Sequence, residues 1–197
     1  MKQLVLATNN EHKIKEIRIL LKNLPVELLT IRDIPNIPPL VEDGLTFQEN
    51  ALKKATTVFR HTGLPALADD SGIEVFYLNM QPGVRSARYA GSNATDAQNN
   101  EKLLQAMRGV APRRRHAQFR SVIALVDKEV LETTEGVFSG TLGESSRGTN
   151  GFGYDPLFIP EGMTKTSAEL TDEEKNAISH RGQSLRKMIK VLRIRFE

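Results

Sequence analysis

The sequence of 197 residues contains no cysteine and no tryptophan, and aromatic residues make up only 6% of it. The lack of cysteine excludes disulfide bonds and zinc or iron–sulfur sites with cysteine ligands, and it is compatible with a reducing compartment. Long hydrophobic runs are also missing, so the sequence offers no membrane span, and its first residues carry no signal-peptide cleavage pattern. We therefore expect a cytoplasmic protein with no membrane partner.

A strong charge of either sign is missing too, because 27 Lys and Arg residues oppose 24 Asp and Glu residues, with a pI near 9.2. The basic excess lies in residues 113–116 and 186–195. Such clusters either contact nucleic acid or form solvated faces, and composition leaves both interpretations open. The length suits one sizeable hydrophobic core, and we expect a single domain over residues 1–197.

Apolar periodicity and capping signals predict alternating strands and helices. Residues 4–7 form an apolar run typical of a buried strand, and a helix follows it after a polar turn. Three further helices are predicted to begin at capping boxes, namely Thr46 with Glu49, Thr95 with Gln98 and Thr171 with Glu174. Strands are predicted at 66–68, 73–78, 117–126, 129–138, 139–143 and 155–159, and a last helix lies near the C-terminus. The alternation predicts an α/β or α+β fold, with a mixed sheet flanked by helices on both faces.

Two adjacent acids, Asp69 and Asp70, end an apolar strand and precede a predicted turn. Buried neighbouring carboxylates repel each other, so a divalent cation or a shared proton is needed to hold them together. A proline-rich loop at 34–39 delivers two more acids, Glu42 and Asp43. The acidic pair therefore predicts a metal site, although a plain polar turn after an edge strand has the same residues.

The turn from Thr8 to Lys13 lies where the first predicted strand meets the first helix. Free backbone N–H groups and the positive end of the helix dipole favour phosphate there, although the glycine spacing of a Walker A loop is missing. On the helix that follows Thr46, Asn50 and Lys54 lie one turn apart on one face. Both patterns fit a phosphate site, and both also fit ordinary caps and surface lysines.

Two later segments fit recognition of a nucleobase. Gly151 and Gly153 flank Phe152, which leaves the face of its ring uncovered for a stacked base, while a tight turn with buried aromatic residues would look the same. His180 and Arg181 lie between two predicted helices and carry donors that can read a keto oxygen, although helix linkers also use such residues as caps. Lys175 lies one short helix earlier.

Six motifs occur in order along nearly the whole chain: Thr8-x-Asn10-x-x-Lys13, Thr46-Phe47-x-Glu49-Asn50-Ala51, Ala68-Asp69-Asp70-Ser71-Gly72, Pro82-Gly83 with Ser86-Ala87-Arg88-Tyr89, Gly151-Phe152-Gly153-Tyr154-Asp155-Pro156 and Ser179-His180-Arg181-Gly182. Together they resemble the inosine/xanthosine triphosphate pyrophosphatase family. The resemblance implies hydrolysis of ITP, dITP and XTP to the monophosphate and pyrophosphate, with Mg²⁺ as cofactor, in a homodimer. It also implies an elongated central mixed β-sheet flanked by helices, with two lobes and the active site in the cleft between them.

The resemblance further implies roles for individual residues. The triphosphate would be held by Thr8, Asn9, Asn10, Glu11, His12 and Lys13, assisted by Lys54. Glu42 and Asp70 would bind the metal, Asp70 would accept the proton of the attacking water, and Ser71 would touch the substrate. The purine pocket would consist of Phe152, Gly153, Tyr154, Asp155, Lys175, His180 and Arg181, with Arg88 as a further candidate contact.

One position departs from the family pattern, because the family usually has glycine where this chain has Asn9. A glycine there suggests a positive φ or a close approach of the backbone to phosphate. Asparagine tolerates the left-handed region better than most residues, so we expect the loop to keep its shape.

Two other functions compete with this interpretation. The basic clusters would suit a nucleic-acid-binding module, but the candidate site mixes acids with lysines, which favours a metal and nucleotide pocket. A phosphatase acting on the terminal phosphate would use similar residues and would release orthophosphate instead of pyrophosphate. We expect a nucleotide substrate and no nucleic-acid partner.

Overall fold

The computed structural model describes residues 2–196. Its strands form a seven-stranded sheet in the order β2-β1-β3-β5-β6-β7, with β4 paired to β3. β1 pairs in parallel with β2 and β3, whereas β3 with β4 and β6 with β7 are antiparallel, which confirms the predicted mixed sheet. The strands are β1 (Lys2–Leu6), β2 (Val26–Thr30), β3 (Ala66–Val75), β4 (Gln81–Pro82), β5 (His116–Val126), β6 (Leu131–Leu142) and β7 (Phe158–Pro160).

The α-helices are α1 (Glu11–Leu21), α2 (Phe47–Thr62), α3 (Asp96–Ala106), α4 (Asp172–Ile178) and α5 (His180–Phe196). Helices α2, α3 and α4 begin directly after Thr46, Thr95 and Thr171, which cap them as the sequence predicts. At α2 the second half of the capping box differs, because the Glu49 carboxylate accepts from the N–H of Leu45. Among the described residues, no helix is both long and apolar enough to cross a membrane.

The chain divides into two compact units. Unit 1 comprises Met1–Asp70, Ser121–Gly136 and Arg181–Glu197, and unit 2 comprises Ser71–Arg120 and Val137–His180. Strands β3, β5 and β6 each contribute residues to both units. The organisation of residues 1–197 as a single domain stays a prediction.

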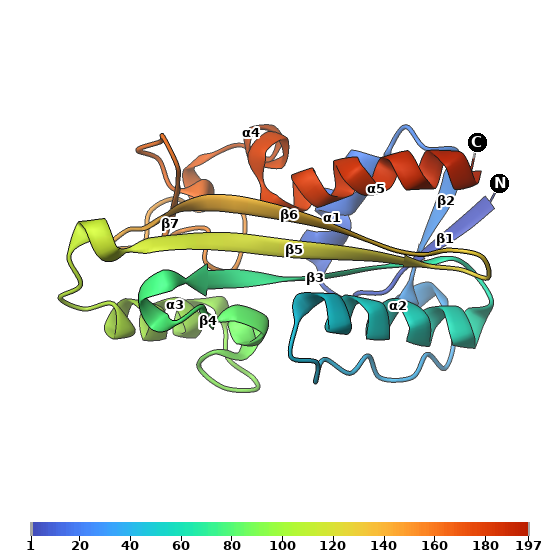
Figure 1. Cartoon of the computed structure of the whole chain (residues 1–197), viewed down its shortest axis with the longest axis horizontal. Helices are drawn as coiled ribbons and strands as arrows, with labels where there is room; N and C mark the ends of the chain where they lie inside the picture. Colours follow the sequence, from blue (N-terminus) through green and yellow to red (C-terminus); the bar gives the residue numbers. More distant parts are fainter. Residues whose placement is uncertain (1, 197) are drawn as a thin grey trace. The chain divides into compact units, whose positions relative to one another are not determined.

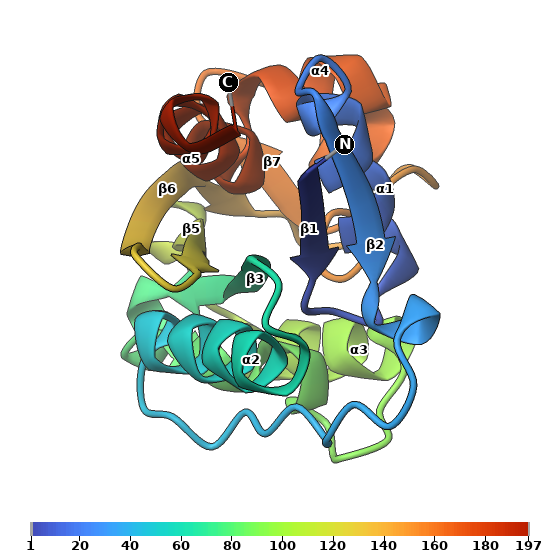
Figure 2. The ribbon, with the colours of Figure 1, turned by 90° about the vertical axis from the view of Figure 1, so that its right-hand side faces the viewer.

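The core of unit 1 forms where helices pack on the sheet. Within this unit, α5 and α2 cover opposite faces of the sheet (Figures 1 and 2). Successive strand residues face opposite sides, so Leu4 and Leu6 point to the same side and join the apolar faces of α1 and α5. The buried residues of this cluster are Leu4, Leu6, Ile14, Ile17, Leu21, Leu24, Leu67, Ile123, Leu125, Leu185, Met188, Leu192 and Phe196.

The core of unit 2 is built around Phe158, whose ring centroid lies 4.8 Å from that of Phe119 and 5.1 Å from that of Phe138. The close packing explains Gly140 in the middle of β6. A Cβ atom at Gly140 would come within 2.3 Å of the Ile159 carbonyl oxygen and 2.7 Å of the Phe158 ring. Glycine therefore lets β7 approach β6 closely enough to pair with it.

The structure corrects the prediction of a turn after Asp70, because residues 66–75 form one uninterrupted strand. The two acids are accommodated inside the sheet by cationic side chains rather than by leaving it for solvent. The strand continues through Gly72. Glycine is needed at this position because a Cβ atom would come within 2.4 Å of Ser86 Oγ and 2.5 Å of the Gly83 carbonyl oxygen. The acids and the glycine in this segment thus reflect close contacts with neighbouring groups and do not mark a turn.

Other predicted boundaries move for local reasons. Residues 76–78 form a 3-10 helix instead of continuing a strand. The strand predicted at 155–159 is shortened to Phe158–Pro160, since the Asp155 N–H bonds to the Phe152 carbonyl in a turn. The linker predicted around His180 is replaced by the start of α5, and only Ser179, with an extended backbone, separates the last two helices.

The arginine cluster at 113–116 is only partly a solvated face. Arg115 is 4% exposed, and its guanidinium donates to the carbonyl oxygens of Leu142, Met107 and Gly143 at 2.6–2.9 Å. Arg114 lies 4.6 Å from the centre of the Tyr77 ring, within range of a cation–π contact. Arg115 therefore fastens α3 and the end of β6 to each other inside unit 2.

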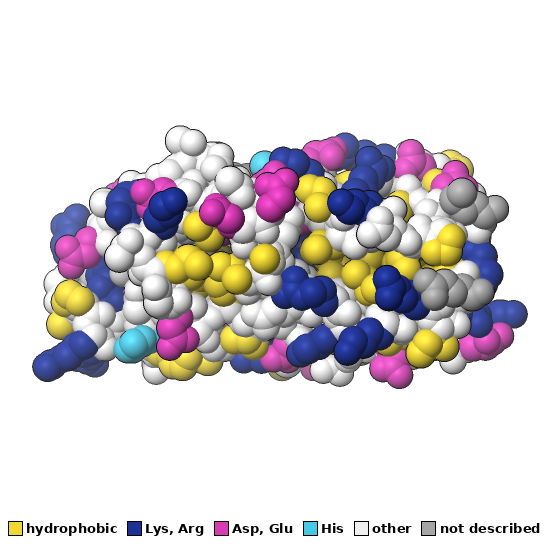
Figure 3. All heavy atoms as spheres, turned by 90° about the horizontal axis from the view of Figure 1, so that it is seen from above, with side chains coloured by type: hydrophobic (Ala, Val, Ile, Leu, Met, Phe, Trp, Pro, Cys, Tyr) yellow, Lys and Arg dark blue, Asp and Glu magenta, His cyan; other side chains and the backbone are white. Residues whose placement is uncertain are grey.

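The basic residues of α5 are mostly exposed, as expected of a solvated face. Arg186, Lys187, Lys190 and Arg193 are exposed. Figure 3 shows dark blue Lys and Arg side chains over the part of the surface where α5 lies, interrupted by apolar and uncharged groups. Arg195 differs, because it donates to Asp127 at 2.6 Å and to Glu129 at 2.7 Å and so ties the end of α5 to the turn between β5 and β6.

We predict that Asp127→Ala lowers the free energy of unfolding by about 1 to 2 kcal/mol at pH 7. The Asp127 carboxylate accepts from the backbone N–H groups of Glu129 and Val130, both at 2.7 Å, and most of the loss comes from these bonds because exposed ion pairs contribute little. Chemical denaturation measures the difference, and Glu132→Ala, an exposed acid on β6, is the matched control.

The stability difference between the wild-type chain and Asp127→Ala is expected to depend on pH. Burial alone would raise the pKa of Asp127, but the hydrogen bonds from the turn and from Arg195 lower it below the usual value. The stabilisation by this carboxylate is complete above the unfolded-state pKa, near 4, and is lost as the pH falls through the lower folded-state pKa. A difference between the wild-type chain and Asp127→Ala that grows on acidification would contradict this account.

Candidate active site

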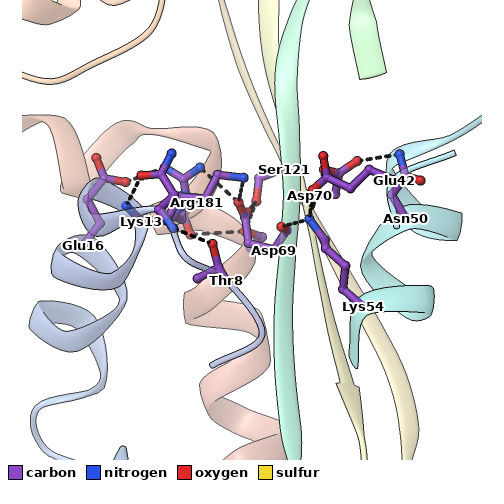
Figure 4. Close-up of polar contacts among 12 residues, drawn as sticks. Thr8, Lys13, Glu16, Glu42, Asn50, Lys54, Asp69, Asp70, Ser121 and Arg181 are labelled. Atoms are coloured by element: carbon purple, nitrogen blue, oxygen red, sulfur yellow. Dashed lines mark hydrogen bonds and ion pairs between the residues drawn. The ribbon is translucent and has the colours of Figure 1, made fainter. Parts of the chain in front are cut away.

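Asp69 and Asp70 are buried neighbours on β3, with 1% and 6% of their surfaces exposed. Because adjacent strand residues point to opposite faces of a sheet, the two carboxylates serve different groups of side chains. Figure 4 shows Asp69 directed towards α1 and Asp70 directed towards α2. The strand therefore separates the two acids, so each is neutralised by its own set of side chains.

The Asp69 carboxylate is surrounded by donors from three elements of unit 1. Lys13 Nζ lies 2.6 Å from Oδ2, an Arg181 nitrogen lies 3.1 Å from Oδ2, and Ser121 Oγ donates to Oδ1 at 2.6 Å. Burial alone would raise the pKa of Asp69, but the charges of Arg181 and Lys13 and the hydrogen bonds of Lys13 and Ser121 hold it well below its usual range. Asp69 is therefore a permanent anion that positions Lys13.

Arg181 is itself 1% exposed, and a second nitrogen of its guanidinium donates to Glu16 on α1. Burial would lower the pKa of Arg181, but the carboxylates of Asp69 and Glu16 more than offset it and raise the pKa. The guanidinium and both carboxylates form one buried network, in which removing any member leaves a charge uncompensated.

On the other side of β3, Lys54 joins two carboxylates. Its Nζ lies 2.6 Å from Glu42 Oε1 and 3.2 Å from Asp70 Oδ1, and it donates to the Asp69 carbonyl oxygen at 2.7 Å. Asn50 Nδ2 donates to the other Asp70 oxygen at 3.1 Å. Burial raises the pKa of Asp70 and the Glu42 charge adds to the effect, while Lys54, Lys13 and Asn50 oppose it. A carboxylate with a raised pKa is suited to accept a proton from water.

Lys54 is 4% exposed, and its pKa is raised although burial by itself would lower it, because the charges of Asp70 and Glu42 outweigh burial. Cationic side chains thus relieve the repulsion between the carboxylates. From the sequence, a divalent cation or a shared proton was expected to do so. Within residues 2–196, no group of three or more His, Asp or Glu side chains is placed to hold a metal ion. Glu42 and Asp70 supply two carboxylates that both contact the Lys54 ammonium. Such a pair fits Mg²⁺, because this ion keeps several waters and is often bound through one or two carboxylates.

The turn before α1 is ordered by its own side chains. Asn10 caps the helix by accepting from the Lys13 N–H at 3.1 Å, and Thr8 Oγ1 accepts from the Asn10 N–H at 3.2 Å. The side chains of Glu11 and His12 are exposed. Lys13 is not the surface lysine of the alternative interpretation, since 13% of its side chain is exposed and it pairs with Asp69.

Asn9 fits this turn without strain. Positive φ values among the described non-glycine residues occur at Asn36, Asn79 and Met80, so Asn9 does not use the left-handed region. Its carbonyl oxygen accepts from Arg32 at 3.0 Å. Asparagine at this position therefore needs no left-handed backbone, and the expectation that the turn keeps the shape it has in the family stays a prediction.

In unit 2, the loop at 151–155 is held by the buried Asp155. Its Oδ2 accepts from the Phe152 N–H at 2.9 Å and from Lys175 Nζ at 2.7 Å, and Lys175 Nζ lies 4.9 Å from the centre of the Phe152 ring. Gly151 has φ 74°, and a Cβ atom there would come within 2.2 Å of the Asp155 carboxylate. Phe152 is half-buried.

Two predicted site residues, Tyr154 and His180, are buried and contact other parts of unit 2. Tyr154 is 3% exposed and donates from its hydroxyl to the Ser86 carbonyl oxygen at 2.8 Å, as the alternative of a buried aromatic residue predicted. His180 is 5% exposed and stacks on Phe119 with ring centroids 4.9 Å apart. Ser71 and Arg88 are half-buried.

Two members of the buried network were missed by the sequence analysis, Glu16 and Ser121. Glu16 lies three residues after Lys13, beside Ile17 on the buried face of α1, so an acid within an apolar stripe was the available signal. Ser121 interrupts the apolar run of β5 and gave no comparable signal.

Comparison with known proteins agrees with this geometry. A dITP/XTP pyrophosphatase of Geobacter sulfurreducens is 50% identical over 186 residues, which is 94% of each chain, and one of Elusimicrobium minutum is 46% identical over 97% of this chain and 100% of its own. The structure of a HAM1 protein from Coxiella burnetii superposes with a TM-score of 0.89 and 45% identity, over 98% of both chains. That of the Staphylococcus aureus Ham1 protein gives 0.88 and 36%, again over 98% of both chains. The sequence model of the Ham1 family matches residues 4–191, and the chain belongs to the Ham1 family.

Proposed function

We propose that this chain is a nucleoside triphosphate pyrophosphatase that hydrolyses noncanonical purine nucleotides, namely ITP, dITP and XTP. The observation that carries the proposal is the buried Asp70, whose pKa is raised and whose carboxylate contacts Lys54 and Asn50. A chain of nearly the same length, 50% identical, bears the name dITP/XTP pyrophosphatase, which supports this substrate class.

In the proposed reaction, Asp70 accepts a proton from the attacking water. The water oxygen forms a bond to the α-phosphorus, the bond from that phosphorus to the bridging oxygen breaks, and pyrophosphate leaves with the electron pair. Thr8 to Lys13 bind the triphosphate, and the ammonium groups of Lys13 and Lys54 offset its negative charge. Ser71 contacts the substrate next to Asp70.

We further propose that Glu42 and Asp70 hold Mg²⁺. The ion would supply positive charge to the phosphate oxygens as the leaving group departs. Lys54, which contacts both carboxylates, must then turn towards the phosphates. Its four-carbon stem allows such a movement without a change in α2.

The purine would be held by the residues that the family resemblance assigns to its pocket. Phe152 stacks on the base, with Gly153, Tyr154 and Asp155 shaping the loop. Lys175, His180 and Arg181 contribute donors, for which the buried Arg181 guanidinium must exchange a contact with Asp69 or Glu16. Donors facing position 6 favour a keto oxygen, because the amino group of adenine would leave them unpaired. We also propose that the chain forms a homodimer, acts in the cytoplasm, and binds neither nucleic acid nor membranes.

We predict that the purified chain with Mg²⁺ converts ITP, dITP and XTP to monophosphate and pyrophosphate, with far slower turnover of ATP and dUTP. A panel that also includes GTP, with pyrophosphate and orthophosphate measured separately, tests reaction and substrate together. Omitting Mg²⁺ tests the cofactor. Release of orthophosphate would instead indicate a terminal phosphatase, and tight, steeply salt-dependent oligonucleotide binding without turnover would indicate a nucleic-acid-binding module.

We predict that Asp70→Asn reduces kcat by roughly 10²- to 10⁴-fold, since the amide can no longer accept the proton from water. The near-isosteric change should leave the circular dichroism spectrum unchanged. Asp43→Asn is the matched control, because Asp43 is an exposed acid one residue after Glu42 and pairs with Lys53. Near wild-type turnover by Asp70→Asn would remove Asp70 from the catalytic centre.

We predict that Lys13→Ala chiefly raises KM, with a loss of roughly tenfold or more in kcat/KM, because one of the charges facing the triphosphate is removed. Asp69 keeps Arg181 and Ser121 as partners, so the variant should still fold, and thermal unfolding checks this. Lys15→Ala changes an exposed lysine of the same helix and serves as the control. An unchanged kcat/KM for Lys13→Ala would exclude a phosphate contact.

A further inference from the structure

Helix α3 holds the backbone of Gly153 at both of its polar groups. The Gly153 N–H donates to Asp96 Oδ2 at 2.7 Å, and the Gly153 carbonyl oxygen accepts from Asn100 Nδ2 at 2.8 Å. Asp96 and Asn100 are four residues apart and therefore lie on one face of the helix. All three residues belong to unit 2, so this contact is internal to it.

Gly153 is open on the side where a side chain would lie. Its φ is 62°, and no described heavy atom lies within 4 Å of the position that a Cβ atom would occupy. A glycine without a packed neighbour retains much conformational freedom. The two hydrogen bonds from α3 therefore restrain the backbone of this part of the loop.

The Asn100 amide is committed to this contact. Asn100 is 7% exposed, and its Oδ1 has no hydrogen-bond partner among the described residues. The amide cannot be turned over, because the Gly153 carbonyl requires a donor. A buried amide with one unsatisfied atom costs free energy, and an apolar side chain would avoid this cost. The contribution of asparagine at this position is therefore its hydrogen bond to Gly153.

The consequence reaches Phe152, whose backbone is held from both sides. Its N–H donates to Asp155, and the next residue is held by Asp96 and Asn100. The direction of the half-buried Phe152 ring depends on these backbone restraints together with Lys175, whose Nζ lies 4.9 Å from the ring centre. Loss of the α3 contacts would let the ring sample several orientations.

We propose that Asp96 and Asn100 are positioning residues that set the affinity and selectivity for the base by fixing the Phe152 loop. The proposal rests on the function proposed above, in which Phe152 stacks on the purine. Neither residue touches the substrate. A preorganised aromatic platform binds a base more tightly because no ordering of the loop is needed on binding.

Helix α3 is anchored independently of this contact, so its variants can be tested as folded proteins. Asn99 donates to the Ala87 carbonyl at 3.1 Å and accepts from the Ala90 N–H at 2.8 Å. Leu103 and Met107 are fully buried in the core of unit 2. Removing Asp96 or the Asn100 amide leaves all of these contacts in place.

The test compares Asp96→Ala, Asn100→Ala and the double variant with the wild-type chain. For each, KM and kcat are measured with dITP, and the inhibition constant is measured for inorganic tripolyphosphate, which carries the phosphates without a base. We expect the double variant to raise KM for dITP by about 5- to 50-fold, the range for losing such hydrogen bonds, and to leave the tripolyphosphate constant within about twofold. The preference for dITP over ATP should fall as well.

Two further variants separate positioning from other effects. Asp96→Asn keeps an acceptor oxygen for the Gly153 N–H but removes the charge, and it should restore most of the affinity for dITP. Glu101→Ala removes an exposed acid from the same helix, where it contacts Gln105, and it should behave like the wild-type chain. Asp96→Asn as weak as Asp96→Ala would assign the effect to charge and overturn the proposal.

The remaining outcomes are also decisive. An unchanged KM for dITP in the double variant, or equal weakening of dITP and tripolyphosphate, would overturn the positioning role while leaving the proposed function intact. Should the alanine variants unfold below the assay temperature, Asp96→Asn and Asp96→Ser still apply, since Asp96 is exposed and each keeps a side-chain oxygen. Selectivity for dITP over ATP that is unchanged in Asp96→Ser would then overturn the proposal. A wild-type chain that does not hydrolyse dITP would overturn the proposed function and this inference together.

Discussion

The buried carboxylate of Asp69 is the interaction on which the site in unit 1 depends. With 1% of its surface exposed, it remains ionised because Arg181 and Lys13 face it and Ser121 donates a hydrogen bond to it. A buried charge without its partners costs several kcal/mol, so the three side chains must be placed together. Arg181 comes from α5 and Lys13 from α1, and one carboxylate on β3 thereby fixes both helices and leaves its neighbour Asp70 with a separate set of contacts.

Much of the fold could be predicted from local signals. Caps such as Thr46 and Thr171 mark helix starts to within one residue, because the capping side chain bonds to a backbone N–H only three positions away. The interruption predicted in β3 was wrong because the groups that hold Asp69 inside the sheet, Ser121 and Arg181, lie 52 and 112 residues further along the chain. Acids in a strand resemble a turn until such distant partners are known.

The candidate site also contains residues that local sequence signals identify and residues that they do not. Ordered motifs brought together Lys13, Lys54 and Asp70 as candidates, since each lies in a segment with its own sequence signal. Residues that support those side chains carry no such signal: Glu16 is hidden in an apolar stripe, and Asp96 resembles an ordinary residue of a helical first turn. Their contribution depends on what they contact in the folded chain, which spacing alone does not encode.

Because Asp69 and Asp70 face opposite sides of β3, the site depends on the number of residues that precede them in the strand. Deleting one residue from the strand before Asp69 would rotate every following side chain to the opposite face. Asp69 would then face α2, and Asp70, the proposed proton acceptor, would face the paired cations of α1 and α5. Both aspartates would still be present, but Ser71 would take the position of Asp70 beside Lys54, and the proposed proton acceptor would be lost.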